Sequence, residues 1–260
     1  MVLAFFYFMA FYLSLHPYFY SYMMVTRQMD PKIAGYIMNT FSVSCTITVV
    51  GVGFLCKYTR YWKPYLYIGV VLYTLGIGLM LRFRNSDAEI WHIVLTQALV
   101  GVGGAFVNGP AQLGVQAVCE HSEVASATAL FLTTLSLGGA VGSSISGAVW
   151  THNIKSKMER YLPEEFLPQV DDLFGDMTKA AGLLAGSPEK MAVDRAYDET
   201  MYSLVWIAFA MCGPMCVAAW WMESSRLPEF EEAAEGRVVF GNMSGKTKVD
   251  VETGEVETKD

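Results

Sequence analysis

Two long stretches without a charged residue lie in the middle of the chain, at 90–119 and 124–153, with only residues 120–123 between them. About 20 apolar residues are enough for a helix to cross a bilayer, so each stretch can span it. The first stretch also contains many glycines and a Gly109-Pro110 pair. Each glycine would cost a soluble helix roughly 1 kcal/mol relative to alanine, whereas membrane helices use small residues to pack closely and to bend. The two stretches therefore predict two membrane helices, the first of them kinked.

Four further charge-free stretches occur elsewhere in the chain, whose residues are 53% hydrophobic. Together the six stretches predict an all-α membrane protein in which residues 1–222 form a six-helix transmembrane bundle. No basic segment precedes the first stretch, so a cleavable signal peptide is not expected. The expected spans are 2–25, 33–56, 64–81, 90–119, 124–153 and 200–222.

Two segments are too polar to lie in the membrane: an expected long non-membrane loop at 154–199 and an expected disordered acidic tail at 223–260. They carry the acidic excess behind the net charge of -7, which indicates solvated segments and gives no reason to expect a nucleic-acid partner. Apolar residues recur in the loop at three- and four-residue steps, which predicts a short amphipathic helix broken at Pro168. Phe166 and Phe174 of this helix either dock the loop on the bundle or contact a bulky ligand.

One face of the expected helix 90–119 is polar. At 100° per residue, an arc of about 120° holds Gln97, Gly101, Gly104, Asn108, Gln112 and Gln116. Buried amides are costly in lipid unless they meet another polar group or water. This face therefore either bonds to neighbouring helices or lines a polar transport cavity. The break at Gly109-Pro110 favours the cavity, because interrupted helices tend to surround binding sites in transporters.

Three side chains of the first span are spaced four residues apart and are expected to share one helix face: Tyr12, His16 and Tyr20. They form either an interfacial aromatic belt with one hydrogen-bonded histidine or a ligand-contacting face with a titratable imidazole. The second span adds an asparagine among serines and threonines. The candidate substrate-pathway residues are therefore Tyr12, His16, Tyr20, Asn39, Asn108, Gln112 and Gln116.

The fifth span contains small residues at four-residue spacing, a pattern that allows close contact between membrane helices. We expect helix packing there, through Gly138, Gly142 and Gly147.

The sequence contains no pattern typical of catalytic or metal-binding chemistry. Its five cysteines form no Cys-x-x-Cys, and its histidines lie on separate segments or at helix ends without a His-x-x-x-His pair. Neither a zinc site nor a disulfide framework is indicated. We therefore expect no catalytic residues, no bound metal and no cofactor, and an intramembrane enzyme is disfavoured.

Several segments resemble one membrane protein family. The basic turn at 53–63 is similar to the degenerate loop motif of the major facilitator superfamily, although the usual acidic residue is absent. Segments 116–125, 128–132 and 138–150, together with the long loop before the last span, resemble fungal siderophore-iron transporters. The resemblance covers most of residues 1–225 and about half of a full-length member. It implies the carboxy-terminal half of a major facilitator fold, with the amino-terminal half missing.

The resemblance also implies a function, namely proton-coupled uptake of ferric siderophore chelates. Its partners would be the ferric siderophore, protons, the lipid bilayer and the missing amino-terminal half, in the plasma membrane or an endosomal or vacuolar membrane of a fungus. The tail would be cytosolic and the loop 154–199 extracellular. None of the six charge-free stretches contains a carboxylate, so the coupling acid is expected in the missing half, with His16 as the local substitute.

Other functions fit the same residues. A major facilitator transporter of another organic substrate, or one for drug efflux, would show the same spans. An inactive truncated product or a non-transporting membrane scaffold would have this sequence too.

Overall fold

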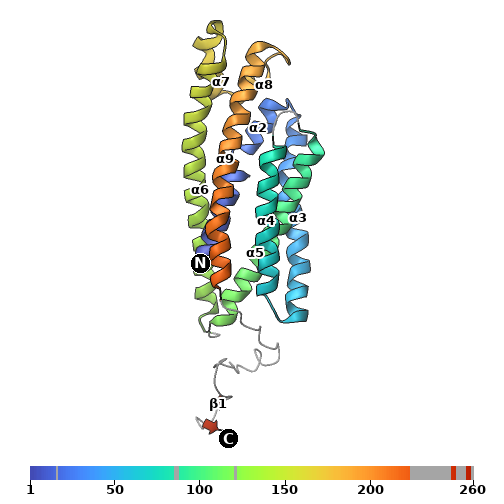
Figure 1. Ribbon diagram of the computed structural model, residues 1–260, viewed down its shortest axis with the longest axis vertical. Helices are drawn as coiled ribbons and strands as arrows, with labels where there is room; N and C mark the ends of the chain where they lie inside the picture. Colours follow the sequence, from blue (N-terminus) through green and yellow to red (C-terminus); the bar gives the residue numbers. More distant parts are fainter. Residues whose placement is uncertain (16, 85–87, 120–121, 223–246, 250–255, 259–260) are drawn as a thin grey trace.

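The computed structural model describes the chain except for residues 16, 85–87, 120–121, 223–246, 250–255 and 259–260. Long helices running along the long axis of the molecule make up most of it (Figure 1). In chain order the elements are α1 (Val2–Ser14), α2 (Phe19–Thr26), α3 (Pro31–Thr59), α4 (Lys63–Phe83), α5 (Ile90–Val118), α6 (Val124–Tyr161), η1 (Glu164–Gln169), α7 (Val170–Gly175), α8 (Met177–Ala181), α9 (Pro188–Trp221), β1 (Thr247–Val249) and β2 (Val256–Thr258).

The fold class predicted from the sequence is confirmed. Within the described residues, six helical segments are long and apolar enough to cross a membrane, with α1 and α2 together forming the first. The other five are α3, α4, α5, α6 and α9. The protein is thus a helical membrane bundle.

The six segments pack as two triplets. One triplet consists of α1, α6 and α9, with α1 in contact with both partners; in the other, α5 packs on α3 and α4. Figure 1 shows α6 and α9 on one side of the bundle and α3, α4 and α5 on the other. The triplets meet where α4 contacts α9, so the buried core is continuous across the bundle.

Glycines bring backbones into direct contact within each triplet. A methyl group on Gly138 of α6 would lie 2.2 Å from the backbone oxygen of Phe5 on α1, and one on Gly142 would lie 2.7 Å from that of Met9. In the other triplet, a methyl group on Gly103 of α5 would lie 2.4 Å from the backbone nitrogen of Tyr73. Gly147 is less tightly packed, since its nearest neighbour would be the Tyr18 hydroxyl at 3.4 Å.

The first span is two helices rather than the single helix expected over 2–25. α1 ends at Ser14 and α2 begins at Phe19, because Pro17 supplies no backbone donor and disfavours a continuous helix. The Arg84 guanidinium, at the end of α4, donates to the Ser14 backbone oxygen and lies 4.3 Å from the centre of the Phe19 ring. A single buried side chain therefore contacts both sides of the break.

The loop expected at 154–199 is shorter than predicted. α6 continues to Tyr161, because Ile154 and Met158 remain buried beyond the last apolar stretch. α9 begins at Pro188, where Ser187 caps the helix by accepting from the backbone N–H of Lys190. The connection between the two helices is therefore 162–187.

This connection is folded against the bundle. η1 contains Pro168 and passes directly into α7, where Val170 and Leu173 are buried. Gln28, between α2 and α3, has a left-handed backbone (φ 46°), and its side-chain nitrogen donates to the backbone oxygens of Ala181 and Leu183, each at 2.7 Å. These two bonds fasten the connection to the end of the first span.

α8 starts at a side-chain cap. The Asp176 carboxylate accepts from the backbone N–H groups of Thr178 and Lys179. The bond from Thr178, which favours the ionised form, lowers the pKa of Asp176.

Most of the tail for which disorder is expected lies outside the described residues. Within it, β1 and β2 pair antiparallel with Lys248 opposite Glu257.

We expect Gly138→Ala to lower the free energy of unfolding by about 1–3 kcal/mol, the usual cost of overpacking. The added methyl group would meet the Phe5 backbone, which cannot move aside like a flexible side chain. Thermal unfolding in detergent measures the effect. Gly51→Ala is the matched control, because its methyl group meets nothing within 4 Å; equal melting temperatures for the two variants would contradict the packing argument.

Candidate substrate pathway

The polar face of α5 holds two amides with buried atoms for which the described residues supply no hydrogen-bond partner. Gln97 is 0% exposed, and neither its side-chain oxygen nor its nitrogen has a hydrogen-bond partner among the residues that the structure describes. The same holds for the side-chain oxygen of Asn108. Such groups are rare in protein interiors because each forfeits its hydration. The face therefore has unused hydrogen-bonding capacity inside the bundle.

Between these amides, α5 packs directly on its neighbours. A methyl group on Gly101 would lie 2.0 Å from the Ser44 hydroxyl of α3, and one on Gly104 would lie 2.7 Å from the Tyr7 hydroxyl of α1. The middle of the polar face thus points toward α1 and α3 and lies inside the half-bundle. This part of the face is in close contact with those helices.

Further along α5 the face opens into a cavity of about 270 Å³ between α3 and α5. Gln112 and Gln116 line it, and the Gln116 side-chain nitrogen donates to the Thr128 hydroxyl of α6 at 3.0 Å. Its remaining lining is apolar or glycine: Val49, Val52, Gly53, Gly109 and Leu113. An apolar cavity with a few amides is the usual make-up of a small-molecule site.

The other predicted pathway residues lie elsewhere. Tyr12 on α1 packs against Gly139 of α6, Tyr20 is half-buried on α2, and Asn39 is exposed on α3. The break between α1 and α2 separates Tyr12 from Tyr20, so their spacing along the chain no longer sets a common helix face. His16 lies outside the described residues.

The membrane-spanning helices differ sharply in the fraction of each that is buried. Only 11% of the span of α3 and 22% of that of α6 is buried, compared with 53% of the first span and 50% of α5. The exposed sides of α3 and α6 mix polar side chains with large apolar ones, such as Ile47 and Leu137. Their exposed polar residues include Asn39, Ser42, Thr46, Thr133, Ser136 and Ser144. Leu75 on α4 is also an exposed apolar residue.

The aromatic residues of the connection pack against the bundle. Phe166 in η1 and Phe174 in α7 are half-buried and contact the apolar core. This contact supports docking of the connection and leaves part of each ring accessible.

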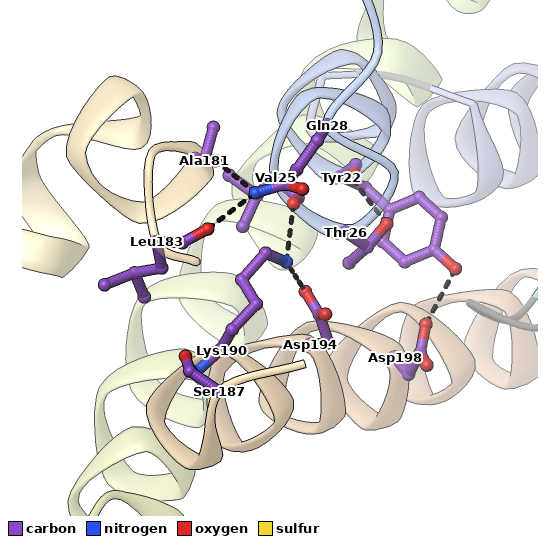
Figure 2. Close-up of polar contacts among 10 residues, drawn as sticks. All are labelled: Tyr22, Val25, Thr26, Gln28, Ala181, Leu183, Ser187, Lys190, Asp194 and Asp198. Carbon is purple, nitrogen blue, oxygen red and sulfur yellow. Dashed lines mark hydrogen bonds and ion pairs between the residues drawn. The ribbon is translucent and has the colours of Figure 1, made fainter. Parts of the chain in front are cut away.

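A polar cluster at the end of the bundle was not predicted from the sequence. The buried Lys190 ammonium of α9 donates to the Val25 backbone oxygen of α2 at 2.9 Å and pairs with Asp194 (Figure 2). One turn along α9, Asp198 accepts from the Tyr22 hydroxyl of α2 at 2.7 Å. The four-residue spacing of Lys190, Asp194 and Asp198 is the sequence signal for this cluster, but all three residues lie within the loop predicted at 154–199.

Arg84 lies near this cluster and interacts electrostatically with Tyr22. It is 4% exposed, and burial lowers its pKa to about 10. Two of its guanidinium nitrogens, Nε and Nη2, have no partner among the described residues.

In the part of the chain that the structure describes, no group of three or more His, Cys, Asp or Glu side chains could hold a metal ion.

The fold defines a multi-pass helical membrane protein. The family model described as Major Facilitator Superfamily matches residues 1–152, more than half of the chain. The chain therefore belongs to the major facilitator superfamily.

Curated relatives narrow the comparison. The chain is 44% identical to Siderophore iron transporter mirC of Emericella nidulans over 233 residues, covering 90% of this chain and 38% of that protein. It is 45% identical to MFS siderochrome iron transporter C of Aspergillus fumigatus over 230 residues, covering 88% and 38%. Siderophore iron transporter 1 of Schizosaccharomyces pombe is 30% identical over 210 residues, covering 81% and 34%. The chain thus spans less than two-fifths of the length of these relatives.

We expect Gln97→Met to raise the free energy of unfolding by about 1–2 kcal/mol, because it removes two buried groups that have no partner. Gln116→Met should instead be destabilising, because it leaves the Thr128 hydroxyl without its donor. Denaturant unfolding in detergent compares the two variants. If Gln97→Met is more destabilising than Gln116→Met, the Gln97 amide makes a stabilising hydrogen bond and is not available to bind another group.

Proposed function

We propose that this chain is the carboxy-terminal half of a secondary active transporter for the proton-coupled uptake of ferric siderophore chelates. The observation that carries the proposal is the cavity lined by Gln112 and Gln116. The break expected at Gly109-Pro110 is not present, since α5 continues through Pro110. Membership of the major facilitator superfamily and the names of the relatives support it. The chain itself is not proposed to catalyse a reaction.

The chemistry of the cavity fits an organic chelate. Iron is the cargo and stays inside its chelator, so the protein needs groups that bind the chelator rather than ligands for the metal. Glutamine amides can donate to the hydroxamate or peptide oxygens at the surface of such a chelate, and apolar walls can cover its carbon atoms. Gln112 and Gln116 are the residues proposed to make these contacts.

The low burial of α3 and α6 supports a missing partner. Their exposed sides mix polar and large apolar side chains, a composition that suits a protein interface. We assign both faces to contact with an amino-terminal half, which the length of the relatives leaves room for. The other long sides of the bundle, such as that around Leu75, would face the lipid bilayer.

The proposed location is the plasma membrane or an endosomal or vacuolar membrane of a fungus. We place the tail in the cytosol. The connection 162–187 then lies at the opposite end of the bundle, on the extracellular or lumenal side. Phe166 and Phe174 would then help to receive the chelate through the exposed parts of their rings.

Uptake is best tested in an intact transporter in which the amino-terminal part of the mirC relative precedes residues 1–260. We expect Gln112→Leu to reduce the uptake of ferric chelate at least fivefold, because the cavity loses a hydrogen-bonding side chain. Radioactive iron accumulation at equal membrane abundance measures it.

Thr74→Leu, a polar-to-leucine change on α4 outside the cavity, is the matched control and should keep uptake within twofold. Normal uptake by Gln112→Leu would mean that the cavity is not the pathway. If chelate is not transported by the unsubstituted protein but another organic substrate is, the chelate assignment fails.

The loop hypothesis has a test of its own. Phe166→Ser together with Phe174→Ser should weaken uptake mainly through a raised KM, because both rings are placed to receive substrate rather than to move it. Leu167→Ser, an exposed apolar residue of η1, is the control. Unchanged KM would contradict substrate contact, and loss of the protein from the membrane would show that the rings dock the connection.

A further inference from the structure

The polar cluster of Figure 2 joins the first span to the last. Lys190 of α9, which pairs with Asp194, donates to the Val25 backbone oxygen near the end of α2, and Asp198 accepts from the Tyr22 hydroxyl of α2. Lys190 is 3% exposed and the Tyr22 side chain is fully buried, while both aspartates are half-buried. α9 thus holds the short helix α2 directly through Asp198 and indirectly through Asp194, whose carboxylate pairs with the Lys190 ammonium.

The position of Lys190 depends on the charge of Asp194. The Val25 oxygen is one of the last carbonyls of α2, where a cation is favoured by the unpaired backbone groups and the helix dipole. Burying the ammonium there is tolerable because the Asp194 carboxylate pairs with it. A proton on Asp194 would cancel that pairing and leave a buried, uncompensated ammonium, so Lys190 would withdraw from α2 toward water.

Asp198 depends on its charge in the same way. A hydroxyl bond to an ionised carboxylate is roughly twice as strong as one between neutral groups. A proton on Asp198 would therefore weaken its bond to Tyr22. Protonation of either aspartate loosens α2 from α9.

Other charged groups face this cluster from the neighbouring elements. Arg27, which follows α2, and Arg84, at the end of α4, both interact electrostatically with Tyr22. On α6, Lys157 pairs with Glu199, which lies about 100° round α9 from Asp198. Tyr22 thus connects Asp198 to the cations that follow α2 and α4, so proton binding at Asp198 changes the balance of charge around a separable helix.

We propose that Asp194, with Asp198 one turn further on, binds the coupling proton, and that proton binding there releases α2 from α9. This rests on the proposed proton-coupled transport. It replaces the expectation that the coupling acid lies in the missing half, since the two aspartates are on the last membrane helix of this chain.

The transport test compares two modes in the intact transporter: accumulation driven by a proton gradient, and exchange of labelled for unlabelled chelate without a gradient. Asp194→Asn should lose at least tenfold in accumulation and keep exchange within twofold, because exchange needs no net proton movement. Asp194→Asn alone leaves the Lys190 ammonium without its carboxylate. The double variant Asp194→Asn, Lys190→Met removes that ammonium as well and should show the same loss of accumulation with exchange retained. Glu199→Gln, next to Asp198 and paired with Lys157 and Arg195, is the matched control and should keep both modes.

Accumulation retained by the double variant overturns the proposal, as does loss of both modes at equal membrane abundance, which would mark a structural role. If the unsubstituted transporter carries chelate at a rate that does not depend on the proton gradient, the proposed proton coupling of uptake is wrong as well.

A second measurement does not depend on transport. Hydrogen exchange in α2, relative to that in α3, should become faster as pH falls in the unsubstituted chain. In the double variant this ratio should be higher at neutral pH than in the unsubstituted chain and should change less with pH, because only the Asp198 contact remains. A ratio that is independent of pH in the unsubstituted chain contradicts the release of α2.

Discussion

Hydrocarbon offers no water to an unpaired backbone group, so each segment that crosses the membrane must bond to itself or be completed by a neighbour. The first span is where this requirement is hardest to meet, because the helix stops at Ser14 and restarts at Phe19. Arg84 donates to the last turn of α1, and Lys190 donates to the last turn of α2. Two buried cations from distant parts of the chain therefore make the broken span possible. The Lys190 ammonium can be buried because it pairs with Asp194, one turn further along the first part of α9.

The charge-free stretches located the six helices because a lipid-facing surface excludes charged residues almost completely. The same criterion does not give the helix ends. Lys155 is the first charged residue after the fifth stretch, yet Ile154 and Met158 continue its buried side and α6 runs on to Tyr161. A hydrophobic stretch reports where lipid begins, whereas hydrogen bonding and packing decide where a helix ends.

The candidate site was predictable only in part. Gln112 and Gln116 line one cavity, as their places on one face of a helix suggested. Gln97 lies on the same polar face of α5 but is not among the predicted pathway residues. It is the most deeply buried of these amides. Tyr12 and Tyr20 do not lie on one helix, because the chain breaks between α1 and α2. The contacts of Lys190 and Asp198 with α2 join residues more than 160 positions apart, and no local pattern encodes such distant pairing.

The two triplets also impose an order on assembly. α3, α4 and α5 follow one another along the chain and can pack as soon as α5 has entered the membrane. α1 precedes these helices in the chain, yet its partners α6 and α9 are synthesised only after α5. The contacts of α1 with the glycines of α6 and its connection through α2 to α9 must therefore wait until α9 has been synthesised. During that interval α1 lacks both helices of its own triplet, which leaves its packing surface open to wrong partners.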